Sequence, residues 1–121
     1  MNKYKNTKIY TIDYLKNNDL TEEDLHNIFD TKSLKYSLRT FMVKLVKPDI
    51  TDNELKRIIG SKKYSTECKF ETSKQFNTTI DELTKVYKNI YQYTDEKCKS
   101  MAEGYMIFNG LRVKNNNFFE V

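Results

Sequence analysis

The sequence predicts an all-α protein, a compact bundle of about five short helices within a single domain. Two observations predict this fold class: an apolar stripe at helical spacing through residues 31–46, and helix-start signals that recur along the chain. A chain of 121 residues is long enough for one domain with its own core. Tyrosine and phenylalanine supply much of the apolar content, and each aromatic ring buries a large area.

Residues 31–46 form the predicted central helix. At 100° per residue, an arc of about 140° collects most of its large apolar side chains. These are Leu34, Leu38, Phe41, Met42, Leu45 and Val46. The arc is wider than a coiled-coil seam, so we expect neighbours on more than one flank. Tyr36 and Val43 lie on the far side, where they offer apolar surface for a possible homodimer.

Threonines at helix-start positions predict four further helices. Thr21 and Thr94 precede acidic first turns, while Thr51 and Thr79 form capping boxes with the acidic residue three positions later. Gly60 is placed to end the second of these helices in a left-handed conformation. The side chains expected to face inward are Leu25, Ile28, Phe29, Leu55, Ile58, Ile59, Ile80, Leu83, Val86, Tyr87, Ile90, Tyr91, Cys98, Met101, Ala102, Tyr105, Met106 and Phe108.

The remaining segments have weaker patterns. Met1–Lys8 (residues 1–8) is expected to be a flexible basic arm. Ile9–Leu15 fits either a short strand or one or two helical turns, with the helix favoured, and Ser61–Asn77 fits a loop with a short helix or a small hairpin. Residues 111–121 form either a polar tail or a small β-hairpin that pairs Leu111–Val113 with Phe118–Val121.

Membrane and secretory classes are disfavoured by the apolar pattern. No run approaches the roughly 18 apolar residues of a membrane span, and the N-terminus lacks the apolar region of a signal peptide. We therefore expect an intracellular protein with reduced Cys68 and Cys98, in the cytoplasm or, for a eukaryotic virus, in the host nucleus. Heavy use of lysine, asparagine and isoleucine is typical of AT-rich genes, such as those of bacteriophages and large DNA viruses.

Catalytic motifs are missing from the sequence. His26 is the single histidine, and the sequence contains no Cys-x-x-Cys pair, no His-x-x-x-His pair and no glycine-rich phosphate loop. The acidic clusters fall in first turns of predicted helices, where capping and the helix dipole explain them. We expect no enzyme activity, no metal and no cofactor.

The positive charge is concentrated in residues 56–74. This stretch has six bases and two acids, so it accounts for the whole net charge of +4. Its bases are Lys56, Arg57, Lys62, Lys63, Lys69 and Lys74. Cations interleaved with hydroxyls and aromatic rings suit contacts with nucleic-acid phosphates. A solvated loop in a lysine-rich protein is the alternative interpretation.

Four features follow one another in a characteristic order. They are the apolar run Phe41–Val46 with the acidic segment up to Leu55, the basic Gly60-Ser61-Lys62-Lys63, the helix start Ile80–Leu83, and a last helix ending near Arg112 and Lys114. This order, over Ser33–Lys114, resembles a BEN domain, an all-helical DNA-binding module of chromatin proteins and large DNA viruses. In that family the basic end of the last helix and nearby loops meet DNA. The resemblance therefore implies DNA contacts for Arg112 and Lys114.

Two functional hypotheses follow. The first is a small intracellular nucleic-acid-binding protein of viral or phage origin, with DNA as the favoured partner. The alternative is an inhibitor or adaptor of phage or viral origin that binds a host protein, because tyrosine is enriched in protein interfaces. Its candidate anchors are Tyr4, Tyr10, Tyr36, Tyr64 and Tyr93, with Asn115–Phe119 as a displayed tip.

Overall fold

The structure of the chain, a computed structural model, describes residues 7–114, which form seven α-helices and no β-strand. The helices are α1 (Ile12–Asn17), α2 (Glu22–Asp30), α3 (Ser33–Val46), α4 (Asp52–Ile59), α5 (Tyr64–Glu67), α6 (Ser73–Tyr91) and α7 (Asp95–Phe108). The all-α prediction is confirmed. The two helices beyond the predicted five, α1 and α5, are short and lie in segments for which the sequence also allowed other structures.

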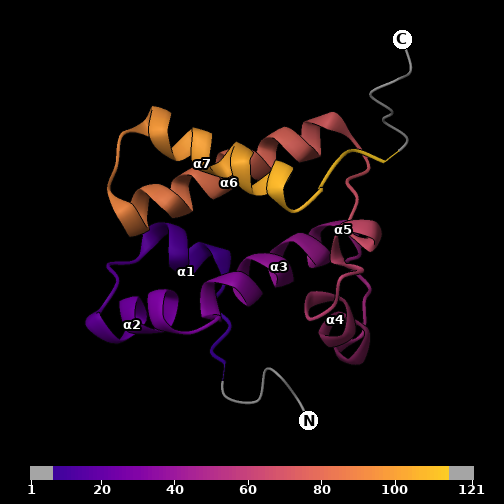
Figure 1. Cartoon of the computed structure of the whole chain (residues 1–121), viewed down its shortest axis with the longest axis horizontal. Coiled ribbons are helices and arrows are strands. Elements are labelled where there is room, and N and C mark those ends of the chain that lie inside the picture. The colour runs from indigo at the N-terminus through magenta and orange to yellow at the C-terminus, as the bar shows by residue number, and fades with distance from the viewer. Residues whose placement is uncertain (1–6, 115–121) are drawn as a thin grey trace.

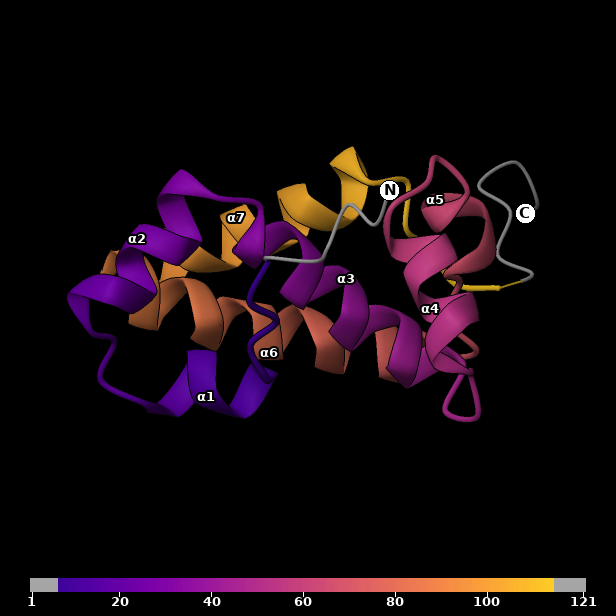
Figure 2. The same cartoon turned by 90° about the horizontal axis from the view of Figure 1, so that it is seen from below.

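Helices α6 and α7 form an antiparallel pair that covers one side of the molecule (Figure 1). Below this pair, α3 runs through the middle, with α2 at one end and α4 at the other (Figure 2). Helix α1 lies between the two groups and packs against both α6 and α3. The largest fully buried side chains come from several of these elements, including Leu15, Met42, Phe70 and Leu83. One core therefore joins the two halves of the chain.

The segment before α1 is held by polar contacts to α2 and α3. The backbone N–H of Tyr10 donates to Ser37 Oγ at 2.8 Å, and Ser33 Oγ donates to the carbonyl of Lys8. The Tyr10 hydroxyl donates to Asp24 Oδ1 at 2.8 Å, and Tyr14 donates to Asp24 Oδ2 at 2.6 Å. These bonds fix α1 beside α2 and bury Asp24 without leaving its carboxylate unpaired.

The central helix differs from its prediction in which side chains it buries. Tyr36 and Val43 are 3% and 0% exposed, whereas Phe41 and Leu45 from the predicted stripe are only half-buried. Helix α3 packs against α1, α2 and α4, so its flanks are covered more evenly than one stripe implies. The prediction that Tyr36 and Val43 offer surface for a homodimer is therefore wrong.

Helix α6 begins about two turns earlier than predicted. Thr72 is its N-cap and accepts a hydrogen bond from the Gln75 N–H at 3.0 Å. Thr79, the predicted cap, is buried inside the helix and donates to the Gln75 carbonyl at 2.8 Å. The extension is stabilised by tertiary contacts, because Phe76 packs edge-on against Phe70 with ring centroids 5.5 Å apart.

The segment after α7 returns to the middle of the chain. Val113 forms a parallel bridge with Phe70, whose N–H donates to the Arg112 carbonyl and whose carbonyl accepts from the Lys114 N–H. Phe118–Val121, the second strand of the predicted hairpin, and most of the predicted arm Met1–Lys8 lie outside the described residues. Within the described residues, Val113 pairs with Phe70.

Candidate nucleic-acid interface

The predicted cationic residues lie on elements that gather at one end of the molecule. Helices α4 and α5, the start of α6 and the segment after α7 meet at the right-hand end of Figure 1. We call this surface the basic end and define it by Lys56, Arg57, Lys62, Lys63, Lys69, Lys74, Arg112 and Lys114. Seven of these side chains are exposed and Lys69 is half-buried, so the fold leaves them accessible to a ligand.

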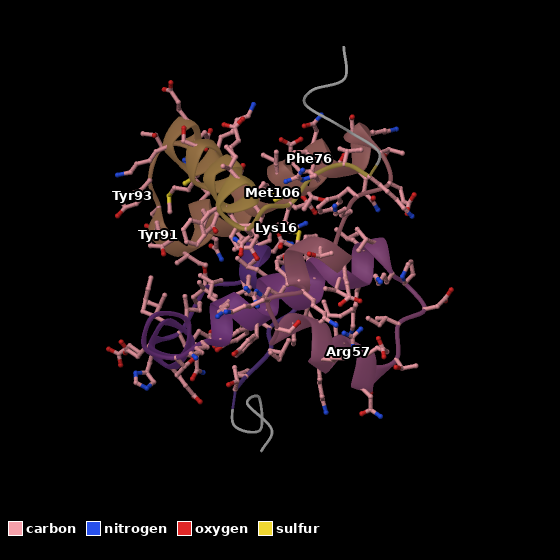
Figure 3. The ribbon with its side chains drawn as sticks, turned by 45° about the vertical axis from the view of Figure 1, so that its right-hand side comes forward. Lys16, Arg57, Phe76, Tyr91, Tyr93 and Met106 are labelled. Carbon is pink, nitrogen blue, oxygen red and sulfur yellow. The ribbon has the colours of Figure 1, made fainter. Side chains whose placement is uncertain are left out.

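Arg57 is compensated by two carboxylates. Its guanidinium lies 2.8 Å from Glu54 on the same helix and 3.1 Å from Glu67 of α5. The hydrogen bonds to Glu67 and then to Glu54 raise the pKa of Arg57. The bond from Arg57 in turn lowers the pKa of the Glu67 carboxyl. This fork links α4 to α5 at the position labelled in Figure 3. The charge of Arg57 is therefore compensated within the folded chain, and its contact with nucleic acid stays a prediction.

Lys114 is the second compensated cation, because its Nζ lies 3.3 Å from Glu71. The remaining cations of the basic end form no ion pair with any carboxylate of residues 7–114; they are Lys56, Lys62, Lys63, Lys69, Lys74 and Arg112. Four carboxylates, those of Asp52, Glu54, Glu67 and Glu71, lie on the same elements. The basic end is therefore positive on balance, with unpaired lysines as its main charges.

Local sequence explains how two of its helices present these charges. The first turn of α6 has no acidic residue, so the partial positive charge of its N-terminus adds to Lys74. The turn from Gly60 to Lys63 projects two lysines between α4 and α5. Gly60 ends α4 with φ −99°, so the predicted left-handed conformation at this residue is wrong.

Most of the predicted tyrosine anchors are buried. Tyr10, Tyr36 and Tyr64 are 5%, 3% and 2% exposed, and Tyr4 and the tip Asn115–Phe119 lie outside the described residues. Tyr10 bonds to Asp24, as described above. Tyr64 contacts Tyr105, with the two hydroxyls 3.3 Å apart, and the Arg39 guanidinium lies over its ring at 4.6 Å.

Tyr93 is exposed, and its ring contacts two neighbouring side chains. The Lys97 ammonium lies 4.0 Å above the ring centroid, and Tyr91 stacks on it at 5.5 Å (Figure 3). Tyr91 in turn meets Phe29 edge-on at 5.6 Å. The exposed Tyr93 ring is therefore part of a row of aromatic side chains in the folded chain.

An exposed apolar pair at the end of α7 was not singled out by the sequence. Ile107 is 79% exposed and Phe108 is 91% exposed, although Phe108 was expected to face the core. Helix α7 turns its inner face, with Cys98, Ala102 and Met106, toward α6. The helical spacing from Ala102 and Met106 places residues 107 and 108 off that face, which is the signal that could have found them.

Groups that could carry redox or metal chemistry are sparse in the described part of the chain. No cluster of three histidine, cysteine or acidic side chains suited to a metal occurs among residues 7–114. His26 lies 2.8 Å from Asp30 on the surface of α2, and the two cysteines are free and buried. Within the same residues, no helix combines the length and the apolarity needed to cross a membrane.

Comparisons of this chain with protein-family models, with curated proteins and with solved structures found no match. The resemblance to a BEN domain therefore stays a prediction.

Proposed function

We propose that the protein binds nucleic acid, with DNA as the favoured partner, through the basic end. One observation carries the proposal: unpaired cations from α4, the turn before α5, the start of α6 and the segment after α7 lie at one end. The proposal includes an intracellular location, the cytoplasm or a host nucleus, which is where two free cysteines are usual.

Lysines dominate this surface, and their chemistry sets the expected mode of binding. An ammonium acts as a point charge on phosphates, so its contribution is salt-dependent and largely independent of sequence. Bidentate base reading in the major groove is most often made by arginine, asparagine or glutamine. Arg112, which has no carboxylate partner in residues 7–114, is the member best suited to a base edge. Nonspecific binding with a modest contribution from Arg112 is the expected behaviour.

The test measures duplex and single-stranded DNA binding across a series of salt concentrations. We expect Lys62→Glu/Lys63→Glu to weaken binding at least about tenfold and to reduce the magnitude of the salt slope by about two, one per lost phosphate contact. The control, Lys88→Glu/Lys99→Glu, makes the same change in net charge at the opposite end, near the α6–α7 turn. It also breaks the exposed ion pair between Lys88 and Asp95, which is expected to cost about 1 kcal/mol of stability or less. Both pairs of lysines are exposed, so the variants should remain folded.

Two results would count against this proposal. Undetectable binding of the wild-type chain to any DNA or RNA at low salt would remove it. Equal loss in both variants would mean that net charge, rather than the basic end, causes the binding.

The alternative function, binding of a host protein as an inhibitor or adaptor, is favoured by a different observation. Ile107 and Phe108 are highly exposed apolar side chains at a helix end, and such residues are enriched at protein contacts. If this function applies, Phe108→Ser should abolish co-purification of a partner that survives nuclease treatment, while Lys62→Glu/Lys63→Glu leaves it intact. The reverse pattern supports the nucleic-acid proposal instead.

A further inference from the structure

A groove follows the half-buried face of α3. On one side of Phe41 and Leu45 a cavity of about 400 Å³ extends to Ile9 and Ile12 of the N-terminal segment and α1. On the other side of the same two residues, a cavity of about 350 Å³ extends to Gln75 and neighbouring residues of α6. Because both cavities share Phe41 and Leu45, they form two halves of one open surface, which we call the α3 groove.

The charges along this groove are unbalanced. Lys44 borders the first half and Lys74 borders the second, and neither forms an ion pair within residues 7–114. The carboxylate of the groove, Glu82, is already held by Lys16 at 2.7 Å and Lys85 at 3.3 Å. These bonds, first to Lys16, lower the pKa of Glu82, so it stays ionised and paired. A ligand that brings carboxylates would therefore meet two cations without a competing anion.

A polar group in the groove also lacks a partner. Thr40 lines the first half, and its Oγ1 is buried with no hydrogen-bond partner among the described residues. Buried hydroxyls are usually satisfied, and an unsatisfied one calls for an explanation. Because that oxygen is shielded from solvent, a main-chain group of a bound segment would bond to it only after the Thr40 side chain rotates toward the groove.

We propose that the α3 groove binds a peptide segment of a partner protein that combines large apolar side chains with carboxylates. The apolar side chains fill the two cavities on either side of Phe41 and Leu45, as in other helix-in-groove or extended-peptide complexes. The carboxylates contact Lys44 and Lys74, which line the two cavities. This activity is separate from nucleic-acid binding, because Lys74 is the one residue that the groove shares with the basic end.

The test begins with an unbiased selection. The full chain is immobilised, a phage-displayed library of random 12-residue peptides is passed over it, and the enriched peptides are sequenced. We expect enrichment of sequences that contain both aromatic or aliphatic anchors and acidic residues. No enrichment, or enrichment of basic sequences, would overturn the proposal.

The selected peptide is then measured against matched variants by fluorescence anisotropy. Lys44→Glu should weaken its binding about fivefold or more, and Ile9→Ser, which removes an apolar side chain from the groove wall without adding a charge, about tenfold. Both positions are exposed, so folding should be retained, which circular dichroism checks. Lys99→Glu on α7 is the control and should leave the affinity unchanged. Equal affinity for Lys44→Glu, Ile9→Ser and wild type would locate the peptide elsewhere and overturn the assignment.

A competition experiment separates this proposal from the proposed function. Single-stranded and duplex DNA should leave the peptide bound, and Lys62→Glu/Lys63→Glu should bind it as wild type does. If DNA displaces the peptide from the wild-type chain but not from Lys44→Glu, the groove is part of a nucleic-acid surface. That result would overturn the peptide assignment. Loss of DNA binding with intact peptide binding in Lys62→Glu/Lys63→Glu would support both proposals independently.

Discussion

Asp24 is the most constrained ionisable residue near the N-terminal segment. It is 3% exposed and accepts hydrogen bonds from Tyr10, Tyr14 and the Thr21 N–H. Burial alone would raise its pKa, but the bonds from Tyr14, the Thr21 amide and Tyr10 together lower the pKa of Asp24 to about 2. The carboxylate is therefore kept ionised, and it joins α2 to the segment that leads into α1.

This network predicts a pH dependence of stability. Because the pKa of Asp24 is lower in the folded than in the unfolded chain, its contribution is complete above about pH 5 and is lost as the pH falls toward 2. The contribution is about 2 kcal/mol of unfolding free energy. Denaturant unfolding across this pH range should give a smaller acid loss for Asp24→Asn than for wild type. Glu23→Gln, at an exposed neighbouring position, should retain the full loss.

The burial of individual tyrosines, also a property of single residues, could not be predicted from the sequence. Their number suggested an interface, but Tyr10 and Tyr64 each find a tertiary polar partner that no local pattern reveals. Burial together with the neighbouring Tyr105 raises the pKa of Tyr64, so its hydroxyl stays protonated in the core. A tyrosine has an apolar ring and a polar hydroxyl, so its burial depends on hydrogen-bond partners supplied by distant segments.

At the scale of elements, the helix starts show which features depend on neighbouring residues and which depend on tertiary contacts. Thr21, Thr51 and Thr94 were predicted as caps, and each accepts a bond from the backbone N–H three residues later. These starts depend on four consecutive residues, so the sequence could predict them. Helix α6 has the same local signal, because Thr72 accepts a bond from the Gln75 N–H and Thr-x-x-Gln is a helix-start pattern. Sequence spacing does not reveal the tertiary contacts of Phe76 with Phe70 and of Gln75 with Leu45, which favour Thr72 over Thr79.

The start of α6 gives a prediction that distinguishes the two caps. Thr72→Ala should lower the unfolding free energy by about 1 kcal/mol, because the Gln75 N–H loses its side-chain acceptor. Thr78→Ala, at an exposed position inside the same helix, should have an effect below about 0.5 kcal/mol. Urea unfolding of both variants measures the difference. Equal effects would mean that the helix begins later in solution.

For the molecule as a whole, the candidate interface was partly predictable. The charge excess in residues 56–74 is a linear property, and the fold brings these residues to one end with Arg112 and Lys114. What the sequence could not give is the pairing, because Arg57 meets Glu67 and Lys114 meets Glu71 only after α5 and the last segment are in place. The α3 groove was missed entirely, since it depends on how three elements meet.

The contact between the end of the described chain and Phe70 predicts a sharp effect of truncation. A chain of residues 1–110 loses buried Leu111 and both main-chain partners of Phe70, whereas residues 1–114 keep them. The shorter chain should lose roughly 3 kcal/mol of unfolding free energy, from one leucine and two hydrogen bonds. Thermal unfolding of the two chains side by side measures this, and equal midpoints would contradict the bridge between Phe70 and Val113.

The two core thiols make the protein convenient for spectroscopy. Cys68 and Cys98 are both 0% exposed, and burial raises the pKa of Cys68 to about 12, so neither should react with maleimide in the native state. A cysteine substituted for Lys62 or for Lys44 would then take up one dye per molecule. Energy transfer from that dye to a labelled oligonucleotide or peptide could follow the basic end and the α3 groove separately in the same preparation.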